Sequence, residues 1–184
     1  MMCRKSDPNS QELCAGLLRA GEVLILPTDT VYGFSGAVGR TDGKIRAVKG
    51  RAEEKPFIQL VAAPADAADL AYDRIPPELL ARWPGALTVI VRSKADPQRT
   101  VAVRCPGDAW LRGVIARSGA PIYSTSANRS GRPPLSSVRE LRAEFEKDVA
   151  LIVDDGDKAA AVPSTIVRVD GGTVSIVRQG AVVI

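Results

Sequence analysis

Short apolar runs of strand length alternate with helix-like segments along the whole chain, and this alternation restricts the fold more than any other feature. Gly171 and Gly172 separate the last two runs and predict a hairpin turn. Helical crossovers connect parallel strands, whereas a hairpin connects antiparallel ones. We therefore expect one α/β domain over residues 1–184, with a mixed β-sheet flanked by helices. Strands are expected at residues 22–26, 57–62, 86–92, 101–104, 122–124, 151–153, 164–169 and 174–178, and helices near residues 41–49, 65–71, 76–83, 109–117 and 137–146.

A further helix is expected near the N-terminus, where the sequence contains residues typical of a helix start and a helix end. It is expected to begin at Asn9 or Ser10 and to end near Arg19. Glu12 is spaced for a capping box on Asn9, and Gly21 is suited to the residue after the helix.

The composition, 45% apolar and 25% charged over 184 residues, is ordinary for a soluble globular protein. The longest apolar runs are too short to span a bilayer, and a polar segment follows Arg4 and Lys5 where a signal peptide needs an apolar one. Three widely spaced cysteines favour reduced thiols, and no Cys-x-x-Cys pair suggests zinc. We expect a cytoplasmic protein without membrane contact and without a protein-held metal.

The chain contains no histidine. This excludes Ser-His-Asp and Cys-His nucleophile systems, histidine acid–base catalysis and most zinc catalysis. An enzyme with this sequence would work by binding and neutralising charge, or by carboxylate or lysine chemistry.

Basic residues are concentrated in two segments. Residues 40–55 hold six lysines and arginines against three acidic residues, and residues 99–132 hold six arginines against Asp108. Such segments suggest a polyanionic ligand, either nucleotide phosphates or nucleic acid. Solvated basic surface explains the same charges equally well.

Several polar segments follow or end the expected strands. In the loop of residues 27–33, Thr28 and Thr30 point the same way and suit the polar head of a ligand, although Thr and Asp also satisfy backbone groups in ordinary turns. Arg104 ends a strand and could receive a carboxylate in a bidentate contact, or be an ordinary edge arginine. Residues 124–131, STSANRSG, follow an apolar strand, and their small residues allow close approach of the backbone to an anion.

Two further groups of cations are candidates for phosphate binding. Lys49, Arg51 and Lys55 could clamp a triphosphate, although Lys49 could equally complement a helix dipole. No P-loop motif is present, so a nucleotide would be held in another way. Arg178 is expected on the strand face of Val174 and Ile176, where it needs an anionic partner or access to water.

Seven of these segments, in this order, resemble the YrdC/Sua5 family of threonylcarbamoyl-AMP synthases in its short form. They are PTDTVYG (27–33), KGR…KP (49–56), PGALT (84–88), VAVRCP (101–106), STSANRSG (124–131), PSTIV (163–167) and IVRQG (176–180). The resemblance implies a twisted sheet enclosing a concave basic cleft. It also implies a nucleotidyltransferase that makes threonylcarbamoyl-AMP and pyrophosphate from L-threonine, bicarbonate and ATP, with Mg²⁺ assisting. The product would serve modification of tRNA adenosine 37 through downstream threonylcarbamoyl-transferase proteins.

The resemblance also assigns roles to individual residues. Catalysis falls to Lys49 and Arg51, which stabilise the leaving pyrophosphate in a reaction that needs no protein nucleophile. The expected ATP contacts are Lys49, Arg51, Lys55, Thr100, Ser126, Asn128 and Arg178, and the expected threonine contacts are Thr28, Thr30, Arg104, Ser124 and Ser164.

The chain departs from the family pattern at four positions: Phe34 replaces leucine, Ala52 a frequent proline, Gln59 a histidine of some members and Pro134 a serine of some members. The last two changes place one threonine contact and one nucleotide contact in doubt.

Two other functions remain open. One is a module that binds double-stranded RNA by shape, with the same basic cleft, and the other is an enzyme that forms carbamoyl-adenylate.

Overall fold

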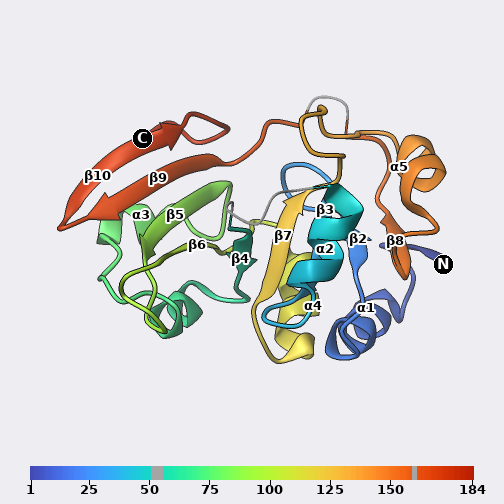
Figure 1. Ribbon diagram of the computed structural model, residues 1–184, viewed down its shortest axis with the longest axis horizontal. Helices are drawn as coiled ribbons and strands as arrows, with labels where there is room; N and C mark the ends of the chain where they lie inside the picture. Colours follow the sequence, from blue (N-terminus) through green and yellow to red (C-terminus); the bar gives the residue numbers. More distant parts are fainter. Residues whose placement is uncertain (51–55, 159–160) are drawn as a thin grey trace.

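The computed structural model describes residues 1–50, 56–158 and 161–184, which form one ten-stranded mixed sheet with helices on both faces (Figure 1). The strand order is β1-β8-β2-β3-β7-β4-β6-β5-β9-β10, with the N-terminus at one end of the sheet and the C-terminus at the other. The expected α/β class and mixed sheet are confirmed. The strands are β1 (Met2–Arg4), β2 (Leu24–Leu26), β3 (Gly33–Ala37), β4 (Ile58–Leu60), β5 (Leu87–Arg92), β6 (Thr100–Arg104), β7 (Ile122–Ser126), β8 (Leu151–Asp154), β9 (Thr165–Asp170) and β10 (Thr173–Arg178).

The helices follow the expected order, with changes at their ends. The helix expected near residues 65–71 is a 3₁₀ helix, and the one expected near residues 76–83 has only one α-helical turn. No capping box forms at Asn9, which makes no side-chain cap hydrogen bond. The helices are α1 (Ser10–Arg19), α2 (Asp42–Lys49), the 3₁₀ helix η1 (Pro64–Asp69), α3 (Pro77–Leu80), α4 (Ala109–Ser118) and α5 (Val138–Phe145).

Strand β3 was not expected from the sequence, although it lies near the centre of the sheet. Its sequence, GFSGA, contains residues with weak strand propensity, so the run resembles a loop. A Cβ atom at Gly33 would lie 3.0 Å from the Ser124 hydroxyl and 3.2 Å from the carbonyl oxygen of Thr125. Glycine therefore allows β3 to pair closely with β7, a requirement that only the folded chain reveals.

Helices cover both faces of one half of the sheet. Leu18 of α1 and Leu111 of α4 pack on one face, and Ile45 of α2 and Phe145 of α5 pack on the other. In the half formed by β4, β6, β5, β9 and β10, η1 and α3 cover only the face that carries Val89, Val103 and Val167. Their strand neighbours Ile90, Ala102 and Ile166 point to the opposite face, where they line a cavity.

Within the described residues, no helix is both long enough and apolar enough to cross a lipid bilayer.

Candidate functional site

A cavity of about 580 Å³ opens over the face of the sheet that η1 and α3 leave uncovered. Its wall is built by the loop after β2, by α2, by strands β4 to β7 and by the final hairpin β9–β10. This volume suits a ligand of the size of a nucleotide or a small metabolite. Nine of the residues predicted from the sequence line it: Thr28, Thr30, Lys49, Arg104, Ser124, Ser126, Asn128, Ser164 and Arg178.

One end of the cavity carries a chain of hydroxyl groups anchored to Arg104. The Thr28 hydroxyl donates to the carbonyl oxygen of Val31 at 2.8 Å, and it lies 2.9 Å from the Thr30 hydroxyl. Because Thr28 has only one hydroxyl proton, Thr30 is the donor between the two. Thr30 in turn accepts a hydrogen bond from Nη1 of Arg104 at 3.1 Å. Both hydroxyl protons are therefore committed within the protein, and Thr30 keeps one lone pair for a ligand.

Arg104 is buried, with 5% of its surface exposed. Its Nε donates to the carbonyl oxygen of Gly85 at 3.0 Å, and Nη2 forms a hydrogen-bonded ion pair with Asp29. A guanidinium group has five N–H donors, so these contacts and the one to Thr30 leave two. The predicted carboxylate contact of Arg104 stays a prediction, but it would use these two donors.

The turn after β7 surrounds Lys49, the last residue of α2. The Lys49 ammonium lies 2.6 Å from the carbonyl oxygen of Ser126, 2.8 Å from Oδ1 of Asn128 and 3.2 Å from the carbonyl oxygen of Asn128. An ammonium has three donors, so a phosphate oxygen would have to replace one of these partners. Lys49 thus shapes the turn as well as supplying charge. Arg129 does not line the cavity. It fastens the same turn to α5 through Glu144 and to the segment after α5 through Asp148, and the hydrogen bond with Glu144 is the main cause of the raised pKa of Arg129.

The third part of the wall comes from the final hairpin. Nη2 of Arg178 donates to the carbonyl oxygen of Ser164 at 2.7 Å, and the Ser164 hydroxyl lies 2.9 Å from that of Thr88. Partial burial, and secondarily the positive charge of Arg104, lower the pKa of Arg178. Two guanidinium groups that influence one another across a cavity favour an anionic ligand between them.

The prediction that Arg178 shares the strand face of Val174 and Ile176 was wrong. A β-bulge lies between Ile176 and Arg178, so Ile176 pairs with Val167 while Arg178 pairs with Ile166. The extra residue reverses the alternation of side chains and turns Arg178 to the cavity.

Other predicted residues lie elsewhere. Thr100 is exposed and does not line the cavity, although it shares a strand face with Arg104, because it lies at the far end of β6. Gln59 occupies the strand position whose side chain points to the opposite face of the sheet, while Pro134 lines the cavity. Arg51 and Lys55 lie outside the described residues. The basic character of the cleft therefore stays a prediction that rests in part on them.

Two residues of the site were missed by the sequence analysis. Asp29 pairs with Arg104, and Thr88 pairs with Ser164. Both lie inside segments that had been singled out, PTDTVYG and PGALT, but nothing in the sequence shows which side chains these loops bring together.

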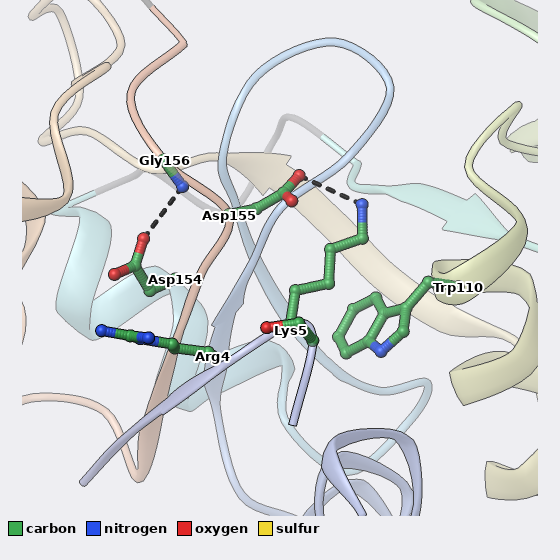
Figure 2. Close-up of a pocket in the computed structure, with 7 residues that line it drawn as sticks. Arg4, Lys5, Trp110, Asp154, Asp155 and Gly156 are labelled. Atoms are coloured by element: carbon green, nitrogen blue, oxygen red, sulfur yellow. Dashed lines mark hydrogen bonds and ion pairs between the residues drawn. The ribbon is translucent and has the colours of Figure 1, made fainter. Parts of the chain in front are cut away.

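A second cavity of about 640 Å³ lies beside β1 and the start of α4, and two of its charged side chains, Lys5 and Asp155, form an ion pair (Figure 2). Figure 2 shows Lys5 pointing toward Asp155, whose carboxylate lies 3.1 Å from the ammonium. The same ammonium lies 2.5 Å from the carboxylate of Asp108 and 5.8 Å from the ring centre of Trp110. Burial alone would lower the pKa of Lys5, but the hydrogen bonds with these two carboxylates raise it. The network fastens the N-terminal strand to α4 and to the loop after β8, which is a structural role.

Comparisons with known proteins identify the family of the chain. Residues 16–180 match the Sua5_yciO_yrdC family model, described as telomere recombination. The threonylcarbamoyl-AMP synthase of Bacillus subtilis is 33% identical over 190 residues, covering 96% of this chain and 55% of the relative. That of Pyrococcus abyssi is 32% identical over 182 residues, covering 91% of this chain and 53% of the relative. The chain thus spans about half the length of these curated relatives.

A solved structure gives the same result. The crystal structure of P. abyssi Sua5 complexed with L-threonine superposes with a TM-score of 0.86 at 29% identity, covering 98% of this chain and 57% of that one. The match to the family model over most of the chain, with relatives above 30% identity, shows that the chain belongs to the Sua5/YciO/YrdC family.

Proposed function

We propose that the chain is a nucleotidyltransferase that makes threonylcarbamoyl-AMP and pyrophosphate from L-threonine, bicarbonate and ATP. The observation that carries this proposal is a single cavity with chemically distinct parts. The hydroxyl chain of Thr28 and Thr30 lies against Arg104 at one end, and Lys49 holds the end of β7 and the small-residue turn after it at another. The names of the curated relatives favour this function over a module that binds double-stranded RNA.

The reaction divides into two bond-forming steps. The amine of threonine attacks the carbon of bicarbonate, a C–N bond forms, and water leaves to give a carbamate. A carbamate oxygen then attacks the α-phosphorus of ATP, and the bond from that phosphorus to the bridging oxygen breaks as pyrophosphate leaves. The second step creates negative charge on pyrophosphate, which cations can stabilise.

Side chains of this protein would hold the reactants and neutralise charge. Arg104 would bind the threonine carboxylate through its two remaining donors, with Thr28, Thr30, Ser124 and Ser164 around the amino acid. The Ser124 hydroxyl lines the cavity and makes no hydrogen bond within the described residues, so it can bind a ligand without first losing a partner. Lys49, Ser126, Asn128 and Arg178 would contact ATP, with Arg51 and Lys55 from the segment outside the described residues. Holding two reactants in line is by itself a large contribution to the rate.

Mg²⁺ would enter with ATP. Among the described residues, the cavity wall contains no carboxylate and no group of acidic, cysteine or histidine side chains could hold a metal. Serine, threonine and asparagine oxygens are present, and Mg²⁺ commonly binds through substrate phosphates with most of its waters retained. When bound, the ion would neutralise phosphate charge.

The product would be passed to proteins that transfer threonylcarbamoyl to adenosine 37 of tRNA, which places the proposed activity in the cytoplasm. If this chain contacts tRNA at all, we expect it to do so while it delivers the product.

The activity is tested by pyrophosphate release from ATP in the presence of Mg²⁺, threonine and bicarbonate. Release that continues when threonine is omitted would argue for simple hydrolysis of ATP to AMP and pyrophosphate.

A further inference from the structure

Asp29 lies between the two threonines of the hydroxyl chain in the sequence, but it is absent from the cavity wall. Its carboxylate joins two other segments. Oδ1 pairs with Nη2 of Arg104, and Oδ2 accepts a hydrogen bond from the backbone N–H of Gly107 at 2.8 Å. The carboxylate thus ties the loop after β2 to the end of β6 and to the loop before α4.

Arg104 needs this carboxylate for its orientation. Its other two protein partners, the carbonyl oxygen of Gly85 and the Thr30 hydroxyl, are neutral. A buried guanidinium group requires a compensating charge and geometrically fixed acceptors. Asp29 supplies both, and it determines which N–H donors of Arg104 remain for the cavity.

We propose that Asp29 is a positioning residue that sets the affinity of the site for its amino-acid substrate through Arg104. This inference rests on the proposed function, because it assumes that Arg104 receives the carboxylate of threonine. Asp29 itself touches no substrate. Its effect should therefore fall on threonine and leave ATP almost unaffected.

Electrostatics and positioning predict opposite outcomes when Asp29 loses its charge. Asp29→Asn removes a negative charge close to the expected carboxylate, so through charge alone it would tighten threonine binding. Through position it would weaken binding, because asparagine has only one acceptor oxygen for two donors, Nη2 of Arg104 and the N–H of Gly107. The direction of the change in KM for threonine therefore separates the two effects.

Gly107 offers an independent perturbation. A Cβ atom at this position would lie 2.9 Å from Oδ2 of Asp29, which is closer than normal packing allows. Gly107→Ala should therefore displace the carboxylate without altering any cavity residue or any charge. It should reproduce the effect of Asp29→Asn in weaker form.

Asp73 supplies a matched control. Its side chain is 16% exposed, against 18% for Asp29, and it also accepts hydrogen bonds from an arginine side chain and a backbone N–H, although both donors belong to Arg92. Asp73 does not line the cavity. Asp73→Asn thus repeats the same chemical change at a distance from the site.

The experiment measures steady-state pyrophosphate release by the full chain with threonine and ATP varied separately. We expect Asp29→Asn to raise the KM for threonine by roughly tenfold to a hundredfold, as displaced positioning groups do, with less than about a twofold change for ATP. Asp73→Asn should change neither. Wild-type protein without threonine-dependent release would refute the proposed function, whereas an active wild type with an unchanged or lower KM in Asp29→Asn would refute this inference alone.

Thermal unfolding of each variant shows whether it is folded. If Asp29→Asn does not fold, Gly107→Ala decides the question, because the three heavy atoms nearest to its Cβ all belong to Asp29. A KM for threonine equal to that of the wild type in folded Gly107→Ala would then overturn the positioning role.

Discussion

Replacing Tyr32 by phenylalanine removes one oxygen atom that joins two loops. Tyr32 is fully buried, belongs to the 27–33 segment, and does not line the cavity. Its hydroxyl donates to the carbonyl oxygen of Gly156 at 2.8 Å and accepts from the N–H of Asp155 at 2.8 Å. These two bonds fasten the loop after β8, which continues toward the Pro163 and Ser164 side of the cavity.

The size of the effect follows from these two bonds. A neutral hydrogen bond contributes about 1 kcal/mol net, a value that already includes the exchange with water, and the Tyr32 hydroxyl makes two. We therefore expect Tyr32→Phe to lower the free energy of unfolding by about 2 kcal/mol. For a chain of 184 residues this corresponds to a fall in Tm of roughly 4–8 °C.

Tyr123→Phe is the matched control. The Tyr123 hydroxyl accepts one hydrogen bond, from the N–H of Gly39 at 3.3 Å near the surface, so its loss should cost below about 0.5 kcal/mol. Urea and thermal unfolding measure both variants. Equal destabilisation by the two substitutions, or none by Tyr32→Phe, would refute the anchoring role of Tyr32.

The same tyrosine predicts a pH dependence. Burial is the main cause that raises the pKa of Tyr32 from its ordinary value of 10.0 to about 12. The unfolded chain ionises this phenol first, so its contribution to stability is complete below about pH 10 and is lost as the pH rises through 12. Tyr32→Phe should therefore lose less stability than the wild type between these values, as measured by urea unfolding at each pH.

Three further predictions concern other groups. Lys49→Met should reduce pyrophosphate release by at least roughly a hundredfold and also lower Tm, because the lysine holds the end of β7 and the turn after it as well as carrying charge; full activity would exclude the charge role, and an unchanged Tm the structural one. Arg178→Ala should raise the KM for ATP by about tenfold or more, the value of a charge-assisted contact, and an unchanged KM would remove it from the nucleotide site. Burial raises the pKa of Cys14 to about 12, so at pH 8 iodoacetamide should label the half-buried Cys3 well before Cys14, as read by mass spectrometry; equal rates would contradict this.

The sequence allowed much of the sheet to be predicted because its strands are apolar and short. Strands such as β5 and β9 are rich in β-branched residues and bounded by turn signals, so their pattern is recognisable locally. Strand β3 was missed because GFSGA has the composition of a loop and becomes a strand only through its pairing with β2 and β7. Strand propensity is weak where neighbouring strands determine the structure.

The site shows the same division between local and long-range information. Motifs in the sequence identified nine residues that line one cavity. The face of Arg178 could not be predicted, because a one-residue bulge is not encoded in the alternation itself. The partnership of Asp29 with Arg104 also joins residues far apart in the chain, and a loop aspartate alone is typical of any turn.

The most direct test of the account is pyrophosphate release from ATP by the purified chain, with threonine and bicarbonate each omitted in turn. We expect pyrophosphate release only when threonine and bicarbonate are both present with Mg²⁺, and we expect one threonylcarbamoyl-AMP to form for each pyrophosphate released. Release that is independent of threonine, or no release under the complete conditions, would contradict it.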